Sequence, residues 1–195
     1  MHFASQMLKK EPKEKNQAPC MIVFCAFNQQ MYLIDLAKRY GLNNYINLVF
    51  RKNFSAQVLK ANMRVVGNAE YGLILYRDKL PKFRNEGKMI MSVMDWEKDN
   101  VSPKLHPTQK PVPLLEKLIK IFTDEGDVVI DPCAGSGSTL VAAENLNRKA
   151  YGFEITREMY NKADKWIEES RVTQREIREL GYAKSKLEKI NPLLF

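Results

Sequence analysis

The chain has 195 residues, enough for one α/β domain with a sizeable apolar core. Its three cysteines do not form a CxxC pair, and its two histidines leave too few ligands for a zinc site. No run approaches the roughly 18 apolar residues of a membrane helix. The N-terminus also lacks the apolar core of a signal peptide, so we expect a cytoplasmic location.

The formal net charge of +8 is unevenly distributed along the chain. Residues 51–88 contain nine Lys or Arg and three Asp or Glu, so this segment carries +6 of the total. A basic surface attracts the phosphates of nucleic acids through counterion release. The alternative interpretation is a solvated basic face without a partner.

The first part of the chain predicts alternating helices and strands. Residues 1–8 have the pattern of a helix, and a polar linker follows. The continuous apolar run of residues 20–26 predicts a strand covered on both faces. A helix over residues 29–40 is expected to stop at Gly41, because glycine accepts the left-handed conformation that ends helices.

Two more strands are predicted at residues 46–50 and 71–76. Between them, residues 53–68 are polar and predict a loop or short helix. Residues 79–100 show little periodicity and predict a connecting loop, which Trp96 is expected to anchor in an apolar pocket. The later elements are a helix ending at Phe122, a strand at 127–131, a helix at 139–147, a helix at 156–170 and an exposed helical tail at 171–195.

The most informative stretch runs from Val128 to Glu154. An apolar strand leads into Asp131-Pro-Cys-Ala-Gly-Ser-Gly-Ser-Thr139, followed by a small-residue helix and a second strand that ends at Glu154. Glycines let a ligand approach the backbone closely, and the start of a helix presents free N–H groups. Glu154 lies 17 residues after Gly137, near the offset of roughly 20 at which an acid binds ribose hydroxyls. The pattern predicts a nucleoside site.

The residues around the turn indicate which nucleoside fits. Leu140 stands where the nicotinamide fingerprint needs a third glycine or alanine, and Ser138 stands where a P-loop needs lysine. Asp131 would repel a pyrophosphate, whereas it would attract the cationic groups of S-adenosylmethionine (SAM). The alternative is a strand–helix–strand unit whose glycines only tighten the turn.

A second motif lies upstream: His106-Pro-Thr-Gln-Lys-Pro111, then an apolar helix, then the Asp131 turn. Together they resemble the SAM-dependent DNA amino-methyltransferases, which modify adenine N6 or cytosine N4. The resemblance is specific in residues 104–168 and weaker in residues 18–90. It implies an α/β, Rossmann-like methyltransferase fold, SAM as cofactor and duplex DNA as partner, and it favours DNA over a solvated face for the basic segment.

The resemblance also implies site residues. Cys133 occupies a position where the family commonly has Phe, and we expect this change to alter packing against the cofactor without abolishing binding. The implied cofactor-binding residues are Thr108, Gln109, Lys110, Asp131, Pro132, Ala134, Gly135, Ser136, Gly137 and Glu154. The candidate DNA-binding residues are Arg51, Lys52, Lys60 and Arg64. No metal is implied.

The order of the motifs resembles the family group whose catalytic motif precedes the SAM motif, which implies a circularly permuted fold. That catalytic motif, Asp-Pro-Pro-Tyr or a close variant, does not occur in the chain. We therefore name no catalytic residue and expect the C-terminal portion of a longer methyltransferase. The expected organisation is one domain over residues 1–195, with a DNA-contacting insert at 51–100 and a SAM-binding half at 104–170.

In such a fold the strand of the catalytic motif lies beside the cofactor strand. Without it, we expect residues 128–131 to pair directly with residues 21–26, to need a partner chain or to be poorly stable. Three functions are weighed: an amino-methyltransferase acting on adenine N6 before cytosine N4; an inactive SAM- and DNA-binding fragment or subunit that needs a second chain or dimer partner; and a methyltransferase acting on RNA or a small molecule.

Overall fold

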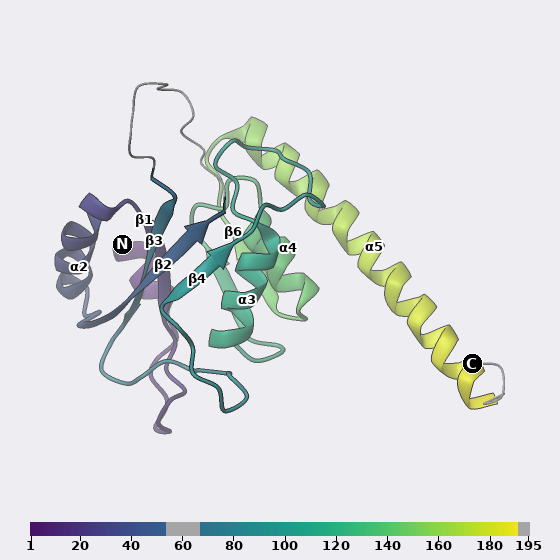
Figure 1. Ribbon diagram of the computed structural model, residues 1–195, viewed down its shortest axis with the longest axis horizontal. Coiled ribbons are helices and arrows are strands. Elements are labelled where there is room, and N and C mark those ends of the chain that lie inside the picture. Colours follow the sequence, from purple (N-terminus) through teal and green to yellow (C-terminus); the bar gives the residue numbers. More distant parts are fainter. Residues whose placement is uncertain (54–66, 191–195) are drawn as a thin grey trace. The chain divides into compact units, whose positions relative to one another are not determined.

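The computed structural model describes residues 1–53 and 67–190, with side chains up to residue 180 (Figure 1). Its contacts divide the chain into two compact units, Met1–Ser102 with Lys117–Asp124, and Pro103–Glu116 with Glu125–Phe195. In the described part of the chain, no helix combines the length and apolar character of a membrane span. The expectation of a single domain over residues 1–195 stays a prediction.

The first unit is built on a four-stranded mixed sheet in the order β1-β3-β2-β4. β3 is antiparallel to both of its neighbours, whereas β2 and β4 are parallel. The buried Leu73, Ile74 and Leu75 make β3 the apolar centre of this sheet. The strands are β1 (Met21–Cys25), β2 (Asn44–Lys52), β3 (Ala69–Tyr76) and β4 (Val93–Trp96).

Helical segments precede and follow β1, as the sequence predicts. Gly41 has φ +78°, so it ends α2 in the conformation expected of a helix-stopping glycine. The buried Ile34 and Ala37 of α2 belong to the same apolar cluster as Leu73 and Leu75 of β3. The segments are α1 (His2–Met7), the 3-10 turn η1 (Phe27–Gln29) and α2 (Gln30–Arg39).

The strand β4 corrects the expectation of a connecting loop over residues 79–100. Met94 and Trp96 are buried while Val93 and Asp95 are exposed, which is the alternation of a half-buried strand. Four residues are too few for this alternation to stand out in a polar stretch. The expected anchoring by Trp96 is confirmed, because its ring meets those of Phe24 and Phe50 edge-on.

β1 is also less buried than its apolar sequence predicts. The strand itself is confirmed, but only Cys25 is buried and the other residues are half-buried. The reason is its position, since β1 is an edge strand that pairs only with β3 in the described residues.

Two cations of the basic segment hold the N-terminal residues in place. Arg77 donates hydrogen bonds to the carbonyls of Ser5, Leu8 and Lys9, just where α1 ends. Lys79 donates to the carbonyls that follow, at Pro12 and Lys13. These two side chains therefore have intramolecular partners and do not form an unoccupied basic face.

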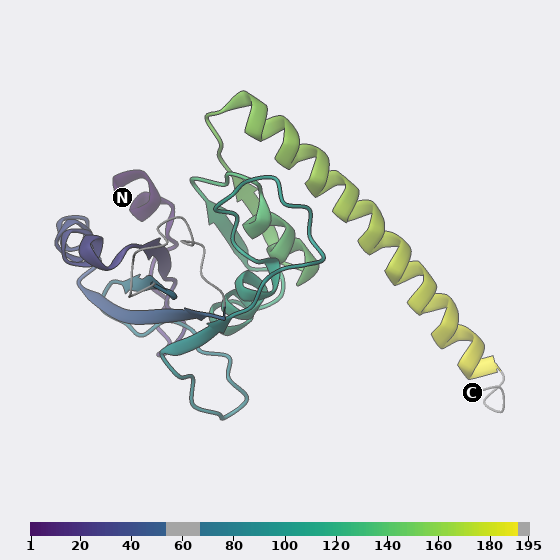
Figure 2. The ribbon, with the colours of Figure 1, turned by 45° about the horizontal axis from the view of Figure 1, so that its top comes forward.

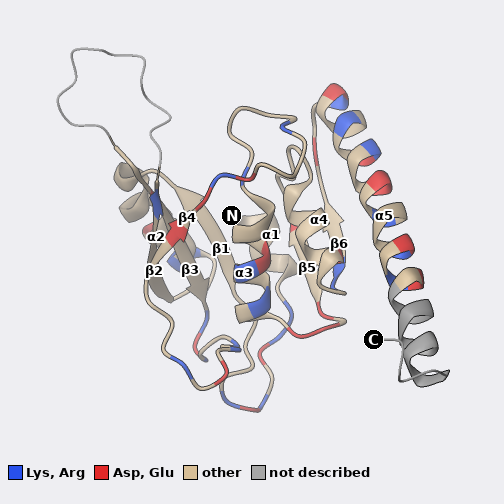
Figure 3. Cartoon of the chain, turned by 45° about the vertical axis from the view of Figure 1, so that its right-hand side comes forward, with Lys and Arg blue, Asp and Glu red and all other residues tan. Residues whose placement is uncertain are grey.

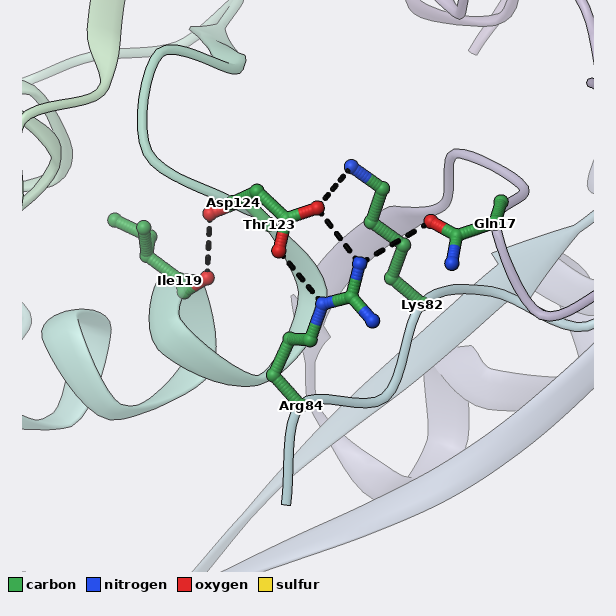
Figure 4. Close-up of polar contacts among 6 residues, drawn as sticks. All are labelled: Gln17, Lys82, Arg84, Ile119, Thr123 and Asp124. Carbon is green, nitrogen blue, oxygen red and sulfur yellow. Dashed lines mark hydrogen bonds and ion pairs between the residues drawn. The ribbon is translucent and has the colours of Figure 1, made fainter. Parts of the chain in front are cut away.

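A third group of contacts joins Lys82 and Arg84 to Asp124, just after the end of α3 (Val112–Phe122) (Figure 4). Arg84 donates to both carboxylate oxygens of Asp124, at 2.6 and 2.8 Å, and Lys82 donates to one of them at 2.9 Å. Arg84 also reaches the side chain of Gln17 at 3.3 Å. The hydrogen bonds from Arg84, and then from Lys82, hold the pKa of Asp124 well below its usual range.

This network predicts a pH-dependent stability. An aspartate whose folded pKa lies below its unfolded value of about 3.9 contributes stability above that value and loses it as the pH falls. Asp124→Asn should lower the unfolding free energy at pH 7 by about 1 kcal/mol or less, because the groups are partly exposed. Urea unfolding at pH 7 and at about pH 3 measures the difference, which should shrink at the lower pH.

The exposed Asp35 of α2 provides the control, because Asp35→Asn removes a carboxylate that forms no ion pair with the described residues. Its unfolding free energy should match that of the wild type at both pH values. An Asp124→Asn variant as stable as the wild type at pH 7 contradicts the role given to the network.

The second unit contains the strand–turn–helix–strand arrangement that the sequence predicts. β5 and β6 are parallel, with Asp131 opposite Gly152 at their carboxyl ends. The buried Val141, Ala142 and Ala143 lie on α4, so its small residues allow close packing, as expected. The elements are β5 (Val128–Asp131), α4 (Ser138–Asn145), β6 (Lys149–Gly152) and α5 (Arg157–Ile190). The first residues of α3 (Val112–Phe122) also belong to this unit.

The expected helix at 156–170 and the described part of the expected helical tail form one continuous helix, α5, up to Ile190 (Figure 2), and residues 191–195 lie outside the described residues. Ala163, Trp166 and Ile167 are buried in its described part, and Arg171 forms an ion pair of 2.6 Å with Glu144 of α4. Figure 3 shows acidic and basic residues interspersed along the described part of α5. The helix is therefore fixed by its first turns and is charged beyond them.

β5 keeps one open edge in the described residues, because its only ladder is the one with β6. The three expectations for this edge, namely direct pairing with residues 21–26, a strand donated by a partner and a low stability, stay predictions.

Candidate cofactor site

The turn after β5 is shaped by two glycines and one aspartate. Gly135 and Gly137 have φ of +54° and +83°, which L side chains rarely adopt. The Asp131 carboxylate accepts the Cys133 N–H at 3.0 Å and fixes the start of the turn. Gly137 is the residue that caps α4, so the N-terminus of this helix adjoins the turn.

The end of β6 is fastened to the same turn. Ala134 N–H donates to the Phe153 carbonyl at 2.9 Å, and Phe153 N–H donates to the Asp131 carbonyl at 3.0 Å. Glu154 accepts the Gly135 N–H at 3.0 Å through one carboxylate oxygen and the Thr156 N–H at 2.8 Å through the other. The structure therefore brings the acid and the glycine turn together, as their sequence separation indicates.

Glu154 is held as a carboxylate. The backbone hydrogen bond from Thr156, with a further one from Gly135, keeps the pKa of Glu154 below its usual range. The side chains beside it are apolar and accessible: Phe153 is 47% exposed and Ile155 is fully exposed. A carboxylate for hydroxyl groups next to open apolar surface fits the ribose and base of a nucleoside.

Close packing behind the turn depends on Gly152. A Cβ at this position would lie 2.7 Å from Leu140 Cδ1 and 2.9 Å from the Ala134 Cβ, closer than real Cβ atoms come. Leu140, which departs from the nicotinamide fingerprint, thus packs over a glycine of the second strand. This role of Gly152 was not predicted from the sequence, although a glycine inside a strand signals close approach of another group.

The upstream motif forms a loop that is bonded to itself. Gln109 accepts the Leu105 N–H at 2.9 Å and donates to the Pro103 carbonyl at 2.8 Å. The Thr108 hydroxyl lies 2.8 Å from Nδ1 of His106. Gln109 is therefore used to shape the loop, and cofactor contacts by Thr108, Gln109 and Lys110 stay predictions.

The remaining turn residues have different environments. Ser136 and Ser138 are buried, whereas Cys133 is exposed and all three cysteines are free thiols. Burial raises the pKa of the Cys20 thiol to about 12, so this thiol stays protonated. Among the described residues, no group of three or more His, Cys, Asp or Glu could hold a metal ion.

Two of the four candidate DNA-binding residues lie at the end of β2. Arg51 forms an ion pair of 2.7 Å with Asp95 and has a side chain that is 65% exposed. Lys52 forms an ion pair of 2.7 Å with Glu70, and its ammonium lies 4.6 Å from the centre of the Trp96 ring. Lys60 and Arg64 lie outside the described residues, and DNA binding by all four stays a prediction.

The α/β fold, with its glycine turn and the acid bonded to it, defines a Rossmann-like methyltransferase of the SAM-dependent class. Within this class, residues 6–165 match the family described as DNA methylase. The chain belongs to this family, the N6-adenine and N4-cytosine DNA methyltransferases, which use SAM. The predictions of family, fold class and cofactor are confirmed.

Individual relatives agree with this assignment. The putative methylase YubD of Escherichia coli strain K12 is 33% identical over 143 residues, which are 73% of this chain and 59% of the relative. The DNA adenine methyltransferase YhdJ of the same strain is 32% identical over 131 residues, which are 66% of this chain and 40% of the relative. This chain therefore spans less than two thirds of either relative.

A solved structure adds a comparison of folds. The crystal structure of the M1.HpyAVI–SAM complex has a TM-score of 0.64 and 30% sequence identity to this chain. The match covers 76% of this chain and 74% of the other.

Proposed function

We propose that this chain binds SAM between the β5 turn and the end of β6. The observation that carries the proposal is the Glu154 carboxylate, which accepts hydrogen bonds from Gly135 and Thr156 and is thereby fixed at the glycine turn. In this role, Glu154 accepts the ribose hydroxyls and Asp131 attracts the cationic methionine end. Pro132, Ala134, Ser136 and Gly137 form the backbone wall of the site.

The proposed reaction is methylation of an exocyclic amino group in duplex DNA. Adenine N6 is the first candidate, supported by the name of the relative YhdJ, and cytosine N4 is the second. Extrusion of the base and its alignment with the methyl donor supply most of the catalysis in such reactions. We propose that this takes place in the cytoplasm.

The proposed reaction also needs residues that align the target amino group with the methyl donor. No segment of the 195-residue sequence matches the Asp-Pro-Pro-Tyr motif or a close variant of it. Our second candidate function is therefore a SAM- and DNA-binding subunit that acts with a partner chain carrying this motif. The observation that favours this second function is the open edge of β5, the strand that ends at Asp131. In the described residues this edge is unpaired, and an unpaired strand edge is a template for another strand.

A methyl-transfer assay separates the two candidates. We expect this chain alone to bind SAM in a calorimetric titration and to transfer labelled methyl groups to duplex DNA very weakly or not at all. The physical reason is that SAM would be held while the target amino group is not oriented. Transfer at the ordinary rate of about 1 per second or faster would contradict this prediction and exclude the need for a partner.

A further inference from the structure

The first unit contains a cavity of about 640 Å³ where β2 and β4 end. These strands are parallel, so their carboxyl ends meet at one edge of the sheet, a common position for ligand sites in α/β proteins. The cavity is lined mostly by polar side chains, and its volume lies in the range of ligand sites. Its described lining consists of Arg51, Lys52, Asn53, Asn68, Asp95, Trp96 and Glu97.

Two of the lining side chains, Lys52 and Trp96, already have partners within the protein. Lys52 is held by Glu70 at 2.7 Å and by the Trp96 ring at 4.6 Å, and the exposed fraction of its side chain is only 18%. Trp96 itself is 5% exposed because it packs against Phe24 and Phe50. These two side chains are therefore already occupied, and recognition is left to the other lining residues, here called the rim: Arg51, Asn53, Asn68, Asp95 and Glu97.

The rim has mixed charge. Arg51 is paired with the carboxylate of Asp95, and the described lining also includes the carboxylate of Glu97 and the amides of Asn53 and Asn68. A site for phosphate would be basic throughout, because carboxylates repel phosphate. A combination of guanidinium, amide and carboxylate groups instead matches the donors and acceptors on the edges of nucleobases.

Arg51 is held in one orientation by Asp95. Its Nε donates to Asp95 Oδ1 at 2.9 Å, and its Nη2 lies 2.7 Å from the same oxygen. Among the described residues, Nη1 of Arg51 has no partner, and 65% of the side chain is exposed to solvent. A guanidinium that is oriented beforehand loses less entropy when it binds. With Nε–H and one N–H of Nη2 directed to Asp95, an N–H of Nη1 and the second N–H of Nη2 are left to donate to O6 and N7 of guanine.

We propose that Arg51 reads a guanine of the DNA at this cavity, with Asp95 as its positioning residue. This inference rests on the proposed DNA binding. It makes Arg51 a determinant of sequence preference, whereas a surface cation that contacts phosphate would bind all sequences alike. It also assigns the Arg51–Asp95 ion pair a function beyond its small contribution to stability.

The test measures binding of the full chain to a panel of short duplexes that differ at one base pair, at several salt concentrations, by fluorescence anisotropy. Arg51→Lys keeps the positive charge but loses the planar guanidinium with its two parallel N–H donors. This variant should lose the preference for guanine, which we expect to be about 5- to 100-fold in affinity, and keep its affinity for the other duplexes. Arg51→Ala should lose the same preference. Arg39→Ala, which removes an exposed arginine on α2, should retain it.

Asp95→Asn distinguishes positioning from simple electrostatics. Removing a negative charge should tighten binding to all duplexes if only charge matters, whereas the proposed role requires that the guanine preference be lost. Uniform weakening by Arg51→Ala, with a salt slope reduced by about 1, would identify a phosphate contact and overturn the inference. A wild-type chain that binds DNA without base preference overturns it and leaves the proposed function intact; a chain that binds no DNA refutes both.

Discussion

Glu154→Ala is expected to weaken SAM binding by about 10- to 100-fold. A hydrogen bond to a charged group contributes about 1.5–3 kcal/mol, and this carboxylate is the proposed acceptor for the ribose hydroxyls. The substitution also removes the acceptor of the Gly135 and Thr156 N–H groups, which loosens the turn itself. Asp131→Ala is expected to act in the same direction, because it removes both the proposed charge partner and the bond to Cys133. Isothermal titration with SAM measures both effects.

Two further variants make this result specific. Glu154→Gln keeps the size of the side chain and one carbonyl oxygen, so its loss should be smaller than that of Glu154→Ala. Glu176→Ala removes an exposed acid from the charged part of α5 and should bind SAM as the wild type does. If Asp131→Ala and Glu154→Ala both bind as the wild type does, the cofactor site has been assigned wrongly.

Gly152→Ala is expected to destabilise the protein by about 1–3 kcal/mol and to reduce SAM binding. The added methyl group would lie 2.7 Å from Leu140 Cδ1 and 2.9 Å from the Ala134 Cβ, so α4 or the turn must move. Because Ala134 belongs to the turn, the strain falls on the cofactor site as well as on the fold. Urea unfolding measures the first effect, and titration with SAM measures the second.

Gly67→Ala is the matched control, since a Cβ at Gly67 would meet no atom of the described residues within 4 Å. Its stability should stay within about 0.5 kcal/mol of the wild type. The double variant Gly152→Ala with Leu140→Ala removes the shorter contact and should recover part of the lost SAM affinity. A Gly152→Ala protein with wild-type stability and affinity would show that the packing described behind the turn is unimportant.

The candidate cofactor site illustrates what local sequence can predict. A glycine turn between a strand and a helix depends on backbone conformations that few residues adopt, so Gly135 and Gly137 identify it. The position of Glu154 follows as well, because two parallel strands bring their carboxyl ends to the same edge. The contact of Leu140 with Gly152 could not be read in this way, since it depends on packing between a helix and a strand.

The basic segment shows the opposite case. Its composition suggests one continuous surface for DNA, but its cations have different partners in the structure. Arg77 and Lys79 hold the N-terminal residues, while Lys82 and Arg84 hold Asp124 at the end of α3. These partners are about 40 or more residues away along the chain, so composition and spacing do not reveal them.

The sequence by itself determined the family, the order of most strands and helices, and the turn with its acid, because each of these depends on residues close together in the chain or on a motif. The tertiary structure alone decided that Val93–Trp96 forms a strand, that β5 has one open edge in the described residues, and that Arg51 is oriented by Asp95. These features arise from hydrogen bonds and ion pairs between distant segments. Their geometry exists only once the chain has folded.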